Sequence, residues 1–224
     1  MKEFIKTLKT STTALLMLAL MFLVVEPTIS NAIEDQFTVT QSVTAEISFL
    51  TPSTDITMSP TIAGLTGGTS NGSTYVRVLT NNALGYNMTL TASSSAGMVG
   101  NSQGGTIPAL IPSSGITPNF AFSSAPANSA AFGYTVEAST TADLAQAFLD
   151  NGSTCNTGSG DTVNSCWVNA STSARTIINR TTSTPSSGAT TTIKFRTIIS
   201  ASPIPAIPQD TYVATTTLTA VVNP

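Results

Sequence analysis

The sequence predicts an all-β protein: an antiparallel β-sandwich, immunoglobulin-like or jelly-roll-like, with long loops and one short helix. Three observations favour this fold class. Several segments alternate apolar and polar residues with a period of two, which is typical of strands with one buried face. Clusters of Gly, Pro, Asn and Ser separate these segments. Serine and threonine make up roughly three residues in ten, while charged residues make up only 8%.

The first predicted strand covers residues 36–49, and a hairpin is predicted from residues 75–80 and 86–92 around the turn residues 81–85. The same alternation predicts further strands over residues 56–62, 107–111, 120–122, 132–138, 174–178, 192–199 and 212–222. Ile193, Phe195 and Leu218 are expected in the core.

The helix is predicted where Thr141 can cap a turn that places Leu144 and Phe148 four residues apart on one face. No linker, charge run or internal repeat divides the rest of the chain. A single domain is therefore expected over residues 33–224.

The amino-terminal segment has the pattern of a secretory signal peptide. Lys2, Lys6 and Lys9 precede an apolar run over residues 14–25, and Ser30-Asn31-Ala32 resembles a cleavage site. We expect residues 1–32 to be removed after Ala32 and the protein to be secreted to the cell surface. An uncleaved anchor is the alternative, although the run is short for a membrane helix.

Composition excludes several classes of function. The chain has no histidine, so it cannot build a Ser-His-Asp triad or an imidazole metal site. The residues 150–161 fail the EF-hand spacing, and no spacing marks a pair of carboxylates as those of a glycosidase. We therefore expect no enzyme, no catalytic residue, no metal and no cofactor.

Charge disfavours nucleic acid and membranes as partners. After signal cleavage five basic and nine acidic residues remain, a net charge of about −4. The basic residues are scattered, whereas phosphate binding needs clustered cations. They are Arg77, Arg175, Arg180, Lys194 and Arg196.

The chain's two cysteines, Cys155 and Cys166, are expected to form a disulfide, because export exposes them to oxidation. A reactive thiol would need a base that the chain lacks, and a metal site would need more ligands. Trp167 follows directly. It is expected either to pack against the disulfide in the core or to stack on a ligand such as a sugar.

Two segments resemble secreted bacterial surface β-sandwiches. The turn at residues 80–90, Thr-Asn-Asn-Ala-Leu-Gly-Tyr-Asn-Met-Thr-Leu, and the ending at residues 208–219 are similar to those of W-x-L surface domains and spore-coat-protein-U-like pilus subunits. Asp210 stands at the usual glycine position, and Cys166-Trp167-Val168 is no W-x-L motif, so peptidoglycan binding is not carried over. The resemblance implies a cell-surface or filament protein. Tyr212 also suits a tyrosine corner.

Two functions remain open. The first is a structural surface protein, a pilus, coat or surface-layer subunit assembled with copies of itself or other surface proteins through β-strand contacts. The second is an adhesin that binds glycan or protein through the loops 93–131 and 150–167. For assembly, residues 36–49 are a candidate donor strand; pairing of this strand within its own chain is the alternative. The donor side chains would be Phe37, Val39, Val43, Ala45, Ile47 and Phe49.

Overall fold

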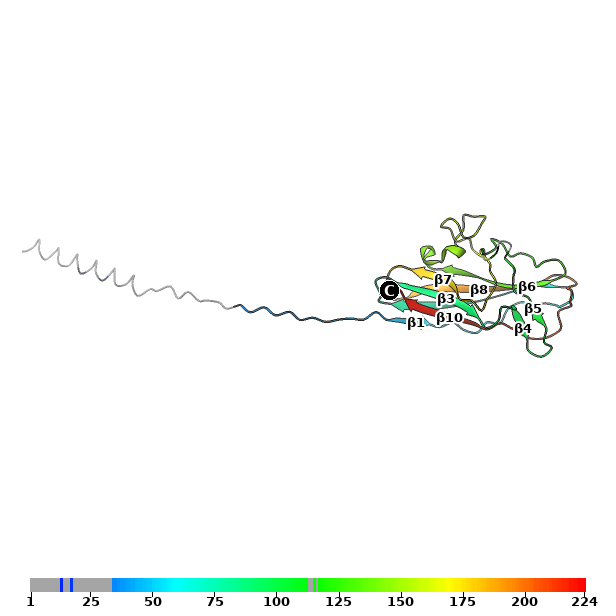
Figure 1. Cartoon of the computed structure of the whole chain (residues 1–224), viewed down its shortest axis with the longest axis horizontal. Coiled ribbons are helices and arrows are strands. Elements are labelled where there is room, and N and C mark those ends of the chain that lie inside the picture. The colour runs from blue at the N-terminus through cyan, green and yellow to red at the C-terminus, as the bar shows by residue number, and fades with distance from the viewer. Residues whose placement is uncertain (1–12, 14–16, 18–33, 113–114, 116) are drawn as a thin grey trace, which may run out of the picture. The chain divides into compact units, whose positions relative to one another are not determined.

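The structure is a computed structural model that describes Thr13, Met17 and residues 34–112, 115 and 117–224. It divides into two units, residues 1–42 and residues 43–224. In the first unit, Thr13 and Met17 are helical, and residues 34–42 are exposed and form no strand. The predicted cleavage site at Ala32 lies outside the described residues, as does nearly all of the predicted signal peptide. The second unit holds the β-structure (Figure 1).

Residues 43–224 form a series of strands joined by long loops. The strands are β1 (Ile47–Thr51), β2 (Gly68–Thr80), β3 (Tyr86–Ala92), β4 (Met98–Gly100), β5 (Thr106–Ile107), β6 (Ala130–Ala138), β7 (Arg175–Arg180), β8 (Ala189–Ile199), β9 (Tyr212–Val213) and β10 (Thr216–Val222). Two short 3-10 turns, η1 (Thr141–Asp143) and η2 (Gln146–Phe148), lie between β6 and β7.

The strands form three antiparallel sheets. The first sheet has the order β1-β2-β8-β6, the second β10-β3-β7, and a small sheet β5-β4-β9. The first and second sheets share one hydrophobic core, which draws on Val76 and Ile193 from the first and on Met88 and Ile178 from the second. The predicted all-β sandwich is therefore confirmed.

Strand β8 carries the centre of this core. Ile193 and Phe195 are buried, as the alternation predicts. The Phe195 ring stacks on Phe132 with 5.8 Å between ring centroids, and it also contacts Tyr134. Leu218 on β10 is only half-buried and packs at the margin of the core.

The first sheet is covered on its outer face as well. Lys194, Arg196 and Ile198 alternate with the core residues of β8 and so point to the opposite face. A second cluster of buried side chains lies there, brought by the loops before β6 and after η2. Its members are Leu110, Phe122, Ala131, Trp167 and Ile198. The two loops predicted to bind a ligand, residues 93–131 and 150–167, thus both contribute buried residues to this outer cluster.

The predicted hairpin at residues 75–92 is wrong, although both of its strands exist. Strand β2 pairs with β1 and β8, whereas β3 pairs with β10 and β7, so the chain crosses between sheets at residues 81–85. The Asn82 side chain bridges this crossing by donating to the carbonyls of Gly85 and Asn223 over 2.9 and 2.7 Å. Gly85 has φ +76°, and a Cβ there would meet the Arg180 carbonyl oxygen. Local turn residues therefore predict a bend but not which strands it joins.

Several other local predictions need correction: residues 120–122 form no strand, and of residues 107–111 only Ile107 belongs to one, β5. Residues 36–46 form no strand; the predicted first strand is limited to β1, which pairs with β2. Residues 56–62 contain one isolated bridge, at Ser59, instead of a strand. The predicted helix is replaced by the turns η1 and η2, because Thr140 makes no side-chain cap and the Ala145 N–H donates to Ile177 of β7. The backbone of this segment is thus hydrogen-bonded to a neighbouring strand, which is more favourable here than a short helix.

Burial of the Phe195 ring predicts a large loss of stability on its removal. Phe195→Ala should lower the free energy of unfolding by about 3–5 kcal/mol, because lost burial and the residual cavity both contribute. Thr217 is an exposed residue of β10, so Thr217→Ala should change the free energy of unfolding by less than about 0.5 kcal/mol. Urea unfolding of both variants measures the difference, and equal shifts of the midpoint would contradict the face assignment.

Candidate functional site

The proposed donor residues fall into two groups in the structure. Phe37, Val39 and Val43 are 84%, 81% and 82% exposed, although each is strongly apolar. Ile47 and Phe49 instead belong to β1, which pairs with β2 within the chain. Ala45 is exposed, and the backbone beside it is tied to Asn81, whose side chain bonds Thr44 and Glu46. The free apolar segment is therefore residues 34–43.

One side of the sandwich is covered incompletely. Strands β1 and β10 are edge strands of the first and second sheets, and they lie beside each other (Figure 1). Half-buried apolar side chains gather along this side from two segments, residues 47–62 and 207–220. They are Ile47, Ile56, Met58, Ile62, Ile207, Tyr212, Ala214, Leu218 and Ala220. We call this the open side.

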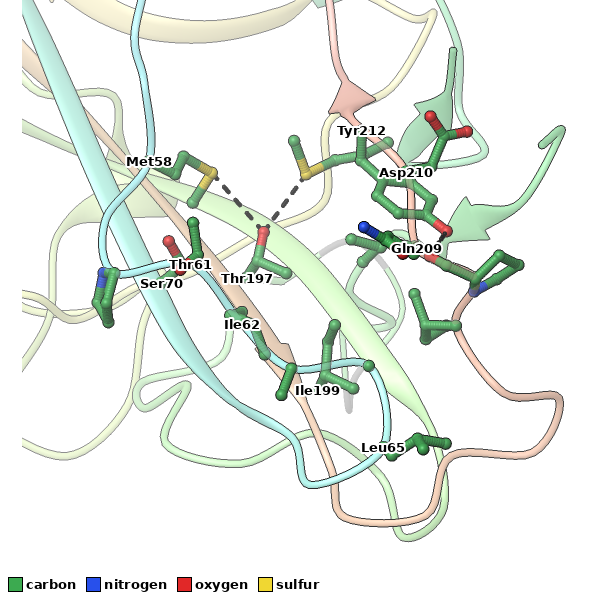
Figure 2. A pocket seen from close by; sticks show the side chains of 17 residues that line it. Met58, Thr61, Ile62, Leu65, Ser70, Thr197, Ile199, Gln209, Asp210 and Tyr212 are labelled. Carbon is green, nitrogen blue, oxygen red and sulfur yellow. Dashed lines mark hydrogen bonds between the residues drawn. The ribbon is translucent and has the colours of Figure 1, made fainter. Parts of the chain in front are cut away.

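A cavity of about 560 Å³ lies at one end of the open side. Its walls are mainly apolar and include Ile62, Ile199 and Ile207. Figure 2 shows Met58 reaching in toward the Thr197 hydroxyl, which lies 3.7 Å from the Met58 sulfur and 3.4 Å from the Met98 sulfur. Such walls can accept apolar side chains, because their aliphatic groups offer apolar contact and the flexible methionine thioethers adapt to the shape of what they contact.

Asp210 and Tyr212 shape the rim of this cavity. The Tyr212 hydroxyl donates to the Pro208 carbonyl over 2.8 Å, which confirms the tyrosine-corner bond. Asp210 accepts hydrogen bonds from the backbone N–H groups of Ser102, Gln103 and Thr211 over 2.7 to 2.9 Å. The bonds from Gln103 and Ser102 hold the pKa of Asp210 below its usual value. The departure from glycine at this position thus fastens a neighbouring loop, which nothing in the sequence pattern indicated.

The predicted disulfide between Cys155 and Cys166 is present. We call residues 155–166 the disulfide loop. Trp167 beside it is 1% exposed; its indole N–H donates to the Asn164 carbonyl over 2.6 Å, and its ring packs edge-on against Phe122. The Arg196 guanidinium lies 4.5 Å from the ring centroid. A ring so enclosed cannot offer a face to a sugar, so the stacking role for Trp167 is wrong and its role is packing.

The buried carboxylate of Asp150 is hydrogen-bonded to the disulfide loop and to the residues before it. Asp150 is 1% exposed and accepts hydrogen bonds from Gly152 N–H and from both the N–H and hydroxyl of Thr162, at 2.7 to 2.8 Å. Burial alone would raise the pKa of Asp150, but these hydrogen bonds outweigh it and hold the pKa below its usual value. At Asp161, burial and the nearby charges of Glu137 and Asp150 raise the pKa to about 6.

Within the described part of the chain, no group of three or more Cys, Asp and Glu side chains is placed to hold a metal ion. The search of the same residues for a helix long and apolar enough to cross a membrane found none. The free apolar segment and the open side are the candidate functional features that exposed and half-buried apolar residues define.

The disulfide should stabilise the fold by restricting the unfolded chain. Replacing both Cys155 and Cys166 by serine should lower the free energy of unfolding by about 2–3 kcal/mol, as loop entropy predicts for a ring of this size. Ser159→Ala in the same exposed loop is the matched control and should have almost no effect. Urea unfolding without reductant makes the comparison, and an unchanged midpoint for the double variant would refute the expected stabilisation.

Asp161 should make stability depend on pH. Because its folded pKa of about 6 lies above the ordinary value of 3.8, the folded state binds a proton more tightly than the unfolded state. Its contribution is fully present below pH 3.8 and is lost as pH rises through 6. The stability of Asp161→Asn relative to the natural protein should therefore increase between pH 4 and pH 7. Thermal unfolding across this range tests it, and a constant difference would contradict it.

Comparison with known proteins assigns no family to the chain: no protein-family model matches it, and no curated protein matches it.

Proposed function

We propose that the protein is a structural subunit of a bacterial surface assembly, such as a pilus, coat or surface layer, and that copies join through β-strand contacts. The observation that carries this proposal is the exposure of Phe37, Val39 and Val43 in a segment without a strand partner. Exposed apolar residues in such a pattern mark an interaction site, since leaving them in water is unfavourable. Phe37, Val39 and Val43 are two and four residues apart, so in an added strand they would share one face, which could be buried.

The open side can accept a donated strand. Strand β10 is paired on one side only, with β3, so its other edge can take a further strand. Its inward residues, among them Leu218 and Ala220, are half-buried. A strand from a second copy laid along β10 would complete these hydrogen bonds and cover the margin of the core. Phe37 and Val39 would then leave water for apolar surroundings.

Export suits this function. The basic and apolar pattern of residues 1–32 is that of a signal peptide, and the Cys155–Cys166 disulfide is typical of oxidising compartments. The alternative, an adhesin that uses the loops 93–131 and 150–167, has less support. Its best ligand-stacking residue, Trp167, is buried, and both loops contribute side chains to the cluster on the outer face of the first sheet.

Aspartate substitutions in the free segment test strand donation. Phe37→Asp with Val39→Asp should leave the secreted protein monomeric, because charged side chains cannot enter an apolar groove unpaired. Thr38→Asp with Thr40→Asp adds the same charges to the intervening positions and should still assemble. Light scattering and electron microscopy of the natural protein and both variants measure assembly. The folded domain should be unaffected, because all four side chains are exposed.

The Phe37→Asp, Val39→Asp variant keeps its own acceptor, so it should bind a peptide of residues 34–46. The same peptide carrying both aspartates should not bind. Strand donation is refuted if the natural protein stays monomeric at high concentration, or if the two double variants assemble equally.

A further inference from the structure

A lysine, an asparagine and a glutamate meet on the outer face of the first sheet, away from the open side. Lys194 comes from β8 and Glu137 from the neighbouring strand β6, and their side chains are 23% and 24% exposed. Asn164 reaches them from the disulfide loop. The Lys194 ammonium is hydrogen-bonded to a Glu137 carboxylate oxygen and donates to Asn164 Oδ1 over 3.1 Å. The Lys194 amine therefore contacts both the carboxyl group of Glu137 and the carboxamide of Asn164.

The backbone holds Asn164 in this position. Its φ is +59°, a left-handed conformation that asparagine adopts more readily than most residues. Its carbonyl accepts the buried Trp167 indole N–H, and its own N–H donates to Glu137 Oε1 over 3.4 Å. The side chain is thus presented to Lys194 from a fixed base.

The separation suits a reaction between the two side chains. A carbonyl bond is about 1.2 Å long, so Lys194 Nζ lies within about 4.3 Å of Asn164 Cγ. Reacting atoms in a near-attack geometry are about 3–3.5 Å apart. A small rotation of either side chain closes the difference. Because the fold already holds the amine beside the amide, little entropy is lost on reaching the transition state, and a reaction that is slow between separate molecules becomes faster.

We propose that Lys194 and Asn164 join in an intramolecular isopeptide bond, with Glu137 as the acid and base. The Lys194 ammonium first transfers a proton to the Glu137 carboxylate, and the neutral amine attacks Asn164 Cγ to form the new C–N bond. Glu137 then gives its proton to Nδ2 and removes one from Nζ. The Cγ–Nδ2 bond breaks and ammonia leaves.

The reaction balances without a co-reactant. Lysine ammonium and asparagine amide become a secondary amide and ammonia, and Glu137 passes its last proton to the departing ammonia and returns to the carboxylate. No oxidant, metal or nucleotide takes part. Asn164 is exposed, so ammonia can leave into water.

The bond would join the disulfide loop covalently to the central strand of the first sheet. In its absence this end of the loop is held to the sheet by polar contacts, including the hydrogen bond from the Thr135 hydroxyl to the Ser165 carbonyl. The link would keep the loop in place over Trp167 even when the disulfide is reduced.

Intact-mass spectrometry of the secreted protein tests the proposal. The natural protein should be lighter by one ammonia than the mass calculated from its sequence with the Cys155–Cys166 disulfide formed. A tryptic digest of the reduced protein should contain the segments around Asn164 and Lys194 as one joined peptide. Lys194→Arg keeps a cation beside Glu137 but cannot form the amide, and it should have its full mass. Asn164→Gly tolerates the left-handed backbone and should also have its full mass.

Glu137→Gln tests whether the carboxyl group is needed for the reaction, or whether the proximity of Lys194 and Asn164 is enough. It should fold with the same circular dichroism spectrum and remain at full mass, or convert far more slowly. A folded natural protein at full mass overturns the proposal. So does an ammonia loss that persists in Lys194→Arg, because asparagine before glycine, as at Asn71 and Asn151, can lose ammonia by cyclising on its own backbone.

Discussion

The pairing of β8 with strands on both sides is the interaction on which the rest of the structure depends. Its backbone is hydrogen-bonded to β2 along one edge and to β6 along the other, and side chains cover both of its faces. The inner residues, Ile193 and Phe195, build the sandwich core. The outer ones meet loops instead of a further sheet. A strand buried on two faces leaves little room for slippage, because a shift by one residue would exchange the two sets of side chains.

The outer layer shows how loops can replace a third sheet. Trp167 and Phe122 supply the apolar surface that covers β8 and β6, while Asp150 satisfies the backbone of the disulfide loop from within. Because the chain has few charged residues, its buried polar groups are mainly hydroxyls, amides and backbone groups, whose burial costs less than that of ions. Of the charged groups on this face, Lys194 and Glu137 form an ion pair, and the Arg196 guanidinium lies over the Trp167 ring. The loops therefore form part of the folded core and are poorly suited to adapt to varied ligands.

The open side and the free segment are two places where apolar side chains of the described residues remain in contact with water. One is a row of half-buried residues beside an unpaired strand edge, and the other is a segment without a strand partner whose apolar residues, Phe37, Val39 and Val43, would lie on one face of a strand. The open side has an unpaired strand edge that can accept a strand, and the free segment is a strand candidate without a partner. This complementarity favours contacts between copies over a ligand of another kind.

The sequence by itself determined the class of fold, the phase of the strands at residues 86–92, 132–138 and 192–199, and the disulfide. These follow from local rules, since alternation reports which side chains share a face. Alternation over residues 36–46 also reported a shared face, but it could not report that no strand lies opposite. Likewise, Asn82 and Gly85 specified a turn, while the crossing between sheets depended on which distant strands compete for β2 and β3. The burial of Trp167 and the meeting of Lys194, Asn164 and Glu137 were decided only by the tertiary structure, because each brings together segments that are remote in the chain and carry no pattern in common.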